Sequence, residues 1–261
     1  MDRCVSRLVV EIGDIRAALA SATLDTIRNC IGIAVTEREE YRSSGFCAVD
    51  GCYFQDPPRI IIAAAAEPRR RAFTALHELA HHLIRNDWDL MWLARDRNLE
   101  EEVCDEFAAE VLVSAELCDR LLSMPPTALE FVALYESSNA SRASCARRVA
   151  SRIPSTGHAV VTLGTVTAYC ATAHSPFRSQ YEVDQGEDSI FGSAVRDGSA
   201  KGQARLVYRE SVVSPIFNAE AVRSGEHVFA IFVEIPDYSP DGSEPPGVLH
   251  QVSRGRGSGI V

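Results

Sequence analysis

The segment FTALHELAHHLI, Phe73 to Ile84, contains three of the seven histidines of this 261-residue chain. His77 and His81 are four residues apart, and Glu78 directly follows the first of them. On an α-helix, residues four apart lie about 40° apart around the axis and one turn apart along it. Two imidazoles placed in this way can bind one metal ion. The spacing therefore predicts a metal site on a helix, against the plainer alternative of a helix with surface histidines.

Glu78 lies about 80° around the helix from the mean direction of the two histidines. A carboxylate at that angle stands beside a metal rather than binding it, where it can act as a general base on a water molecule. His82 falls outside the face of the pair, so we expect it at the surface or behind the ligands. Leu76, Leu79 and neighbouring apolar residues point away from the histidines and form a stripe for the core.

A third metal ligand is expected in the downstream segment NLEEEVCDEFAAEVLV. Zinc in a hydrolytic site commonly takes three protein ligands and one water. Glu101 shares a helix face with Asp105, so we expect Glu101 as the ligand. Asp105 is then placed to accept the outer N–H of a ligating histidine, which fixes the tautomer of that ring. Glu100 is the alternative third ligand, because its angle also falls toward the apolar side.

The same segment, as a helix, is predicted to have two further faces. Val103, Cys104, Phe107, Ala108 and Val111 form an apolar stripe next to the face of Glu101. Glu102, Glu106 and Glu110 are expected on the opposite, solvated face.

The elements that must hold these side chains are a small sheet followed by two long helices. Apolar residues at helical spacing alternate along the chain with short strand-like runs. An Asp-Gly pair inside one of these runs is typical of a hairpin turn. The predicted elements are a helix at 9–30, strands in IGIAVTERE, GFCAVDGCYFQ and RIIIA, and helices at 69–85 and 99–113.

The pattern changes near Pro154 to Gly157, where strand-like runs replace helical periodicity. We therefore expect an α+β protein with a domain at 1–125 that holds the metal site and a helical segment at 126–154. A β-rich C-terminal domain is expected at 155–238. The Pro, Gly and Ser content after Ser239 predicts a flexible tail at 239–261.

Charge and cysteine usage exclude several classes of protein. The formal net charge of −10 argues against general binding to phosphate backbones, so we do not expect direct DNA binding. The eight cysteines form no CxxC pair and are typical of reduced thiols in a cytosolic protein. No apolar run reaches the roughly 18 residues that a transmembrane helix needs, and the N-terminus lacks the apolar core of a signal peptide. We expect a cytoplasmic protein without membrane association.

The segments RRRAFTALHELAHHLI and EEVCDEFAAEVLVS resemble the two signature phrases of the ImmA/IrrE family of zinc metallopeptidases. That family typically shows F-T-x-A-H-E-L-G-H-x-L and then E-x-x-A-N-x-F-A-x-x-L-L-M-P. The matching residues are Phe73, Thr74, His77, Glu78, Leu79, His81, Leu83, Glu101, Phe107, Ala108, Ala109 and Leu112. The departures are Ala80 for Gly, Cys104 for Ala, Asp105 for Asn and Val113-Ser114 for Met-Pro. The likeness covers about Arg59 to Ser114 and fades beyond Ile153.

The resemblance implies a zincin-like core in which His77, His81 and Glu101 bind Zn²⁺ and Glu78 is the catalytic base. Family members commonly cleave a helix-turn-helix transcriptional repressor in a stress response, which implies a substrate of that class. Some carry a helix-turn-helix-like segment and a GAF-like domain, so 155–238 is interpreted as a sensor or substrate-docking unit. The competing function is a non-catalytic regulator that binds a repressor or DNA. The basic side chains of 126–154 either face such a partner or belong to helices that cap the protease core; they are Arg142, Arg147, Arg148 and Arg152.

Overall fold

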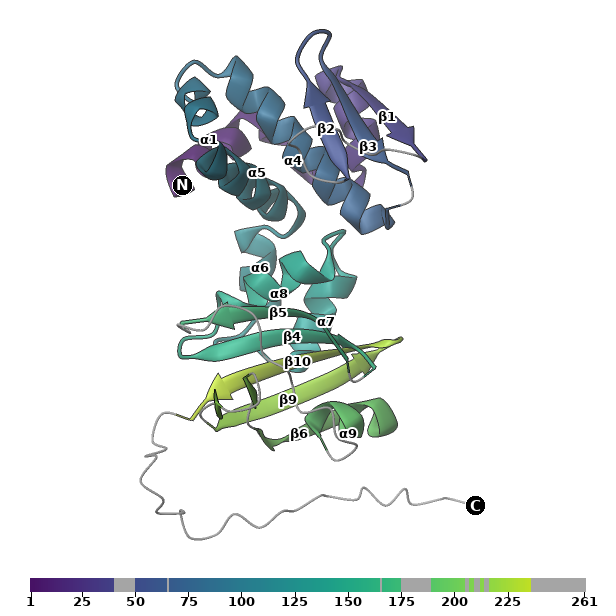
Figure 1. The fold of residues 1–261 in the computed structure, drawn as a ribbon, viewed down its shortest axis with the longest axis vertical. Helices are drawn as coiled ribbons and strands as arrows, with labels where there is room; N and C mark the ends of the chain where they lie inside the picture. Colours follow the sequence, from purple (N-terminus) through teal and green to yellow (C-terminus); the bar gives the residue numbers. More distant parts are fainter. Residues whose placement is uncertain are drawn as a thin grey trace.

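The computed structural model of the protein shows a mixed α+β fold in three tiers (Figure 1). An N-terminal tier of helices and a small sheet lies above a layer of short helices, and a larger sheet with one helix on its far side lies below them. The structure describes residues 1–39, 50–64, 66–164, 166–174, 189–204, 207–208, 212–213 and 216–235. The predicted flexible tail and residues 45–49, the first strand of the proposed Asp-Gly hairpin, fall outside these ranges, whereas the Asp-Gly pair itself, Asp50 and Gly51, is described.

The N-terminal helices are shorter than the single helix predicted at 9–30. The chain leaves helical geometry at Gly13, which has a φ of 43°, and again at Ala22, with φ −135° and ψ 57°. A positive φ is costly for residues with a Cβ, so the glycine marks a break that apolar periodicity alone does not reveal. The elements are α1 (Asp2–Ile12), a 3₁₀ turn η1 (Gly13–Ile15), α2 (Arg16–Ser21), α3 (Thr23–Thr26) and a π-helical turn η2 (Ile27–Ile31).

The small sheet has the strand order β1-β3-β2, with β1 parallel and β2 antiparallel to β3. Its strands are β1 (Ala34–Arg38), β2 (Gly51–Phe54) and β3 (Arg59–Ala63). Gly51 and Tyr53 of β2 are buried while their neighbours are half-buried, as expected for an edge strand with one face on a helix. That helix is α4 (Pro68–Asn86), which packs on β2 and β3.

The two helices predicted to carry the site are both present, and their ends follow from local signals. Proline opens α4, where its missing N–H costs no hydrogen bond. The side chain of Asp96 accepts a hydrogen bond from the backbone N–H of Leu99 and caps α5 (Arg97–Leu112). A 3₁₀ segment, η3 (Met91–Arg95), connects the pair, and α4 packs directly against α5.

The helical layer consists of α6 (Ala115–Leu121), α7 (Ala128–Glu136) and α8 (Arg142–Ala150). Thr127 and Glu130 form a capping box at the start of α7, and Ser141 caps α8. α7 packs on strands β9 (Phe217–Ser224) and β10 (His227–Glu234), whereas α8 packs on β4 (Gly157–Leu163) and β5 (Val166–Ala173). The helices therefore cover one face of the lower sheet, as Figure 1 shows.

The lower sheet is antiparallel with the order β5-β4-β10-β9-β6. Alternate residues of its central strands face opposite cores: Val161 and Phe229 point toward α7 and α8, and Val160 and Phe232 point toward α9. The elements are β4 (Gly157–Leu163), β5 (Val166–Ala173), α9 (Ile190–Asp197), β6 (Ser199–Ala204), β9 (Phe217–Ser224) and β10 (His227–Glu234), with a two-stranded ribbon of β7 (Val207–Tyr208) and β8 (Val212–Val213).

One buried apolar cluster runs from α1 through α4, α5, α7 and α8 onto the lower sheet. Phe131 of α7 meets Phe229 of β10 edge-to-face at 5.1 Å between ring centroids. The predicted switch to strands after Pro154 is visible, but the core continues across that point. Within the described ranges, none of the helices combines the length and apolar character that crossing a bilayer requires.

Candidate metal centre

His77 and His81 lie one turn apart on α4, and both face α5. Their side chains are buried, with 6% and 3% of the residue surface exposed, and the ring centroids are 5.0 Å apart. These histidines are therefore not surface residues of an amphipathic helix. They line an internal face between two helices, as a metal site on α4 requires.

Glu101 lies opposite both rings. One of its carboxylate oxygens is 3.2 Å from Nε2 of His77, and the other is 3.7 Å from Nε2 of His81. Donors about 2.0–2.2 Å from a tetrahedral zinc ion are separated from one another by roughly 3.3–3.6 Å. The two measured distances bracket that range. About a third of the Glu101 side chain is exposed, so this side of the site opens to solvent.

Two further carboxylates face the Nδ1 edges of the two rings, opposite the Nε2 atoms that face Glu101. Nδ1 of His77 is 2.9 Å from Asp105, and Nδ1 of His81 is 2.8 Å from Glu100. An imidazole that donates Nδ1–H to a carboxylate keeps a lone pair on Nε2 for a metal. The pairing of Asp105 with a histidine agrees with the sequence prediction. Glu100, the alternative ligand, faces the nitrogen on the far side of the ring from Glu101.

Glu78 is fully buried beside the two rings. Burial raises the pKa of its carboxyl group, and the nearby histidines oppose this rise. Gly51 at the start of β2 makes room for it, because a Cβ there would lie 3.3 Å from a Glu78 oxygen. The small sheet thus closes over the residue expected to act as a base.

Several buried polar atoms at the site lack a hydrogen bond within the described part of the chain. They are Nε2 of His81 and both carboxylate oxygens of Glu78. Buried polar atoms are nearly always satisfied, so these atoms point to a missing polar partner. A divalent cation between the histidines and Glu101, with water beside Glu78, supplies partners for all three. The donor set of two imidazoles and a carboxylate fits zinc.

The charges of the metal-free site are strongly coupled. Burial lowers the pKa of His77, but hydrogen bonds to Asp105 and Glu101 outweigh it and raise the pKa to about 9. The hydrogen bond to His77 lowers the pKa of Glu101, and that to His81 lowers the pKa of Glu100. Arg97 lies 3.8 Å from Glu101, and Arg85 lies 3.5 Å from Glu100. The site therefore holds ionised carboxylates around its histidines.

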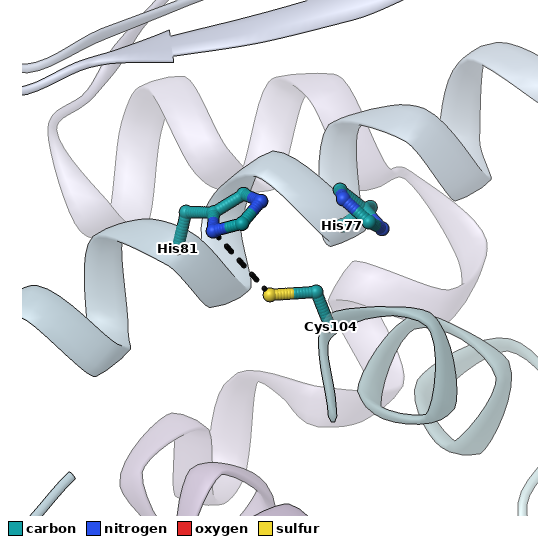
Figure 2. Close-up of side chains that lie close together, drawn as sticks. All are labelled: His77, His81 and Cys104. Carbon is teal, nitrogen blue, oxygen red and sulfur yellow. Dashed lines mark hydrogen bonds between the residues drawn. The ribbon is translucent and has the colours of Figure 1, made fainter. Parts of the chain in front are cut away.

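Cys104 is a further residue at this site, although sequence analysis placed it only in an apolar stripe. Figure 2 shows its sulfur directed toward the His81 ring, 3.6 Å from Nδ1. His77, His81 and Cys104 each offer a donor atom within 4.8 Å of the others, which is an alternative metal set. We favour Glu101, because the Cys104 sulfur approaches the His81 nitrogen that Glu100 already binds. Burial also raises the pKa of the thiol, which opposes formation of a thiolate ligand.

Other residues singled out from the sequence have structural partners. His82 is half-buried, and its Nδ1 is 2.9 Å from the hydroxyl of Tyr53, so it braces α4 against β2. Glu102 is exposed, whereas Glu106 and Glu110 are half-buried and not fully solvated as expected. Arg148 of α8 contacts both of them at 2.8 and 3.0 Å. The sequence prediction failed here because it had no information on the helix that packs against this side of α5.

The IrrE N-terminal-like domain, a peptidase domain, matches residues 29–138. Residues 29–138 are thus similar to the N-terminal domain of IrrE proteins. All of His77, Glu78, His81, Glu100, Glu101, Cys104 and Asp105 lie inside the matched segment. α8 and the lower sheet lie beyond it.

A curated ImmA/IrrE-family relative is the radiation response metalloprotease IrrE of Deinococcus deserti. The chain is 33% identical to it over 111 residues, and the match spans 40% of each protein. The chain thus spans less than half the length of this relative. A solved structure of a Mycobacterium tuberculosis transcriptional regulator gives a TM-score of 0.48 at 13% identity, covering 89% of this chain and 75% of that one. Nothing follows for this chain from a likeness at that level.

Proposed function

We propose that this protein is a zinc-dependent endopeptidase with His77, His81 and Glu101 as metal ligands. The observation that carries the proposal is the convergence of two imidazole Nε2 atoms on one carboxylate, beside the buried Glu78. The family match supports a metallopeptidase domain around these residues. Asp105 supports His77 by accepting its Nδ1–H at 2.9 Å.

Zinc, when bound, lowers the pKa of water toward ~7 and polarises the scissile carbonyl. Glu78 accepts a proton from the attacking water as the water oxygen adds to the carbonyl carbon. The same carboxyl group then returns the proton to the leaving amine as the C–N bond breaks. Its burial supports this role, because a carboxylate removed from solvent is a stronger base than one in water.

The proposed substrate is a helix-turn-helix transcriptional repressor, whose cleavage relieves repression. This part rests on the resemblance of the two signature phrases to ImmA/IrrE proteins. The Deinococcus deserti relative is named a radiation response metalloprotease, which agrees with proteolysis during stress. The C-terminal unit at 155–238 is proposed as the sensor or substrate-docking part.

The competing proposal is a regulator that binds a repressor or DNA without cleaving it. Direct DNA binding through α8 is disfavoured by the contacts of its arginines. Arg148 pairs with Glu106 and Glu110, Arg152 pairs with Asp119, and Arg147 donates to the Tyr169 hydroxyl at 2.9 Å. These contacts support the interpretation that α7 and α8 cap the protease core.

The deciding experiment uses Glu78→Gln, which keeps the side-chain shape and removes the proton acceptor. Zinc content should stay near that of the wild type, and cleavage of a repressor encoded beside this gene should fall roughly 10²–10⁴-fold. His77→Ala should lose both zinc and cleavage. Glu102→Gln is the matched control, because Glu102 lies on α5 but is exposed. Wild-type cleavage by Glu78→Gln would refute the mechanism, and binding of the repressor without turnover by the wild type would favour the regulator.

A further inference from the structure

Glu100 is a buried carboxylate that neither the metal set nor the base requires. Only 4% of its surface is exposed. One of its oxygens lies 2.8 Å from Nδ1 of His81 and 3.5 Å from the guanidinium of Arg85. Burying a carboxylate costs several kcal/mol unless it is paired. We therefore expect the buried charge of Glu100 to have a specific role beside Nδ1 of His81.

Adjacent glutamates bracket the His81 ring. Glu100 faces Nδ1, whereas Glu101 faces Nε2. This is possible because neighbouring residues on α5 point about 100° apart around the helix. Arg85 follows His81 by one turn on α4, so it lies on the same side and neutralises Glu100 without reaching the metal position.

The thiol of Cys104 competes with the carboxylate of Glu100 for Nδ1 of His81. Cys104 follows Glu100 by one turn on α5, and its sulfur is 3.6 Å from the same Nδ1. A thiol is a weak donor as well as a weak acceptor. With Glu100 present, Nδ1–H donates to the carboxylate and Nε2 keeps its lone pair. With Glu100 removed, the thiol S–H can donate a hydrogen bond to Nδ1, which favours the tautomer whose ring proton is on Nε2.

We propose that Glu100 is a positioning residue that holds His81 in the tautomer and orientation with Nε2 free for zinc, against the competing thiol of Cys104. The inference rests on the proposed zinc site and adds a residue to it. Asp105 faces Nδ1 of His77 in the corresponding way, at 2.9 Å.

The test measures zinc affinity of the full-length protein by competition with a chromophoric chelator at pH 8. Glu100→Leu should weaken zinc binding about 10–100-fold, the usual effect of losing such a partner. Glu100→Gln should weaken it less, because its amide oxygen still accepts Nδ1–H. Glu102→Gln should bind as the wild type does. Adding Cys104→Ala to Glu100→Leu should recover part of the affinity, since no thiol then competes for Nδ1.

A second readout separates positioning from folding. Two-bond ¹H–¹⁵N spectra of the metal-free proteins should show His81 with the proton on Nδ1 in the wild type and on Nε2 in Glu100→Leu. If the single variant lowers the melting temperature of the metal-free protein while zinc affinity and tautomer stay unchanged, Glu100 is only structural and the inference fails. Loss of zinc stoichiometry in Glu100→Gln but not in Glu101→Gln would make Glu100 a ligand and also overturn it. Absence of zinc binding by the wild type would instead refute the proposed function.

Discussion

Zinc binding should release a proton from His77. In the metal-free protein its pKa is about 9, against an ordinary value near 6.5. At pH 7.5 the ring is therefore about 97% protonated. A zinc ion can bind Nε2 only after that proton leaves. We expect release of close to one proton per zinc at this pH.

The magnitude follows from the difference of about 2.5 between the two pKa values, which corresponds to about 3 kcal/mol. Because the folded pKa is raised, the protonated ring stabilises the metal-free fold below pH 6.5, and this contribution is lost as the pH rises to 9. Zinc affinity changes in the opposite direction. It should rise about tenfold per pH unit between pH 6.5 and 9, or about 300-fold in all.

Calorimetric titration of zinc into metal-free protein, in two buffers of different ionisation enthalpy, measures the released protons. Every protein in these titrations should carry Glu78→Gln, so that Glu78 cannot take up the proton that His77 releases. Adding Asp105→Asn should lower the pKa of His77, because the amide removes a negative charge 2.9 Å from Nδ1. Equal proton release with Asp and with Asn at position 105, or a zinc affinity that is flat between pH 6.5 and 8.5, would refute this reasoning.

Two further predictions concern packing and acid stability. Gly51→Ala should cost about 1–3 kcal/mol of unfolding free energy and reduce cleavage, because the new Cβ would lie 2.3 Å from the Thr74 methyl and 3.3 Å from Glu78. Urea unfolding measures the change, and Gly202→Ala is the control because the space around that strand position is open. Equal losses of unfolding free energy in the two variants would count against close packing at Gly51. Burial lowers the pKa of His158 to about 4, so the unfolded chain binds the proton first as pH falls below 6.5. This group should lower the free energy of unfolding by about 2 kcal/mol between pH 7.5 and 5. The His158→Gln variant should therefore lose less stability than the wild type over this pH range. Parallel curves of unfolding free energy against pH for the two proteins would contradict this prediction.

Much of the site could be predicted from the sequence because its information is local. A one-turn spacing on one helix places His77 and His81 together without any knowledge of the fold. The predicted helices at 69–85 and 99–113 match α4 and α5 to within two residues at each end. Glu101 and Asp105, one turn apart on α5, reach the two edges of the His77 ring. To bring the side chains of α5 to the histidines of α4, the prediction needed only the assumption that the two helices pack together.

The parts that failed depend on contacts between distant segments. Glu106 and Glu110 looked solvated because nothing in α5 reveals that Arg148 will pack against them. The arginines of α8 were left open between facing a partner and capping the protease core, because their own segment does not show the side chains that contact them. The continuous core across Pro154 was also invisible, since apolar positions of α7 and of β10 show burial but not the partner that covers them.

The four carboxylates around the histidines differ in role although three of them are the same residue type. What separates them is the ring atom that each one faces. Glu101 faces both Nε2 atoms, so a cation there meets a charged oxygen. Glu100 and Asp105 face Nδ1 atoms, where their oxygens are placed to accept a hydrogen bond from Nδ1–H.

Glu78 faces no ring nitrogen at hydrogen-bonding distance among the described residues, and its oxygens are therefore available to a water molecule. Exchanging the roles of Glu100 and Glu101 would need a rotation of α5 by about 100°. That rotation would expose Val103 and Phe107, which are both fully buried. The packing of α5 in the core thus selects which carboxylate can bind the metal.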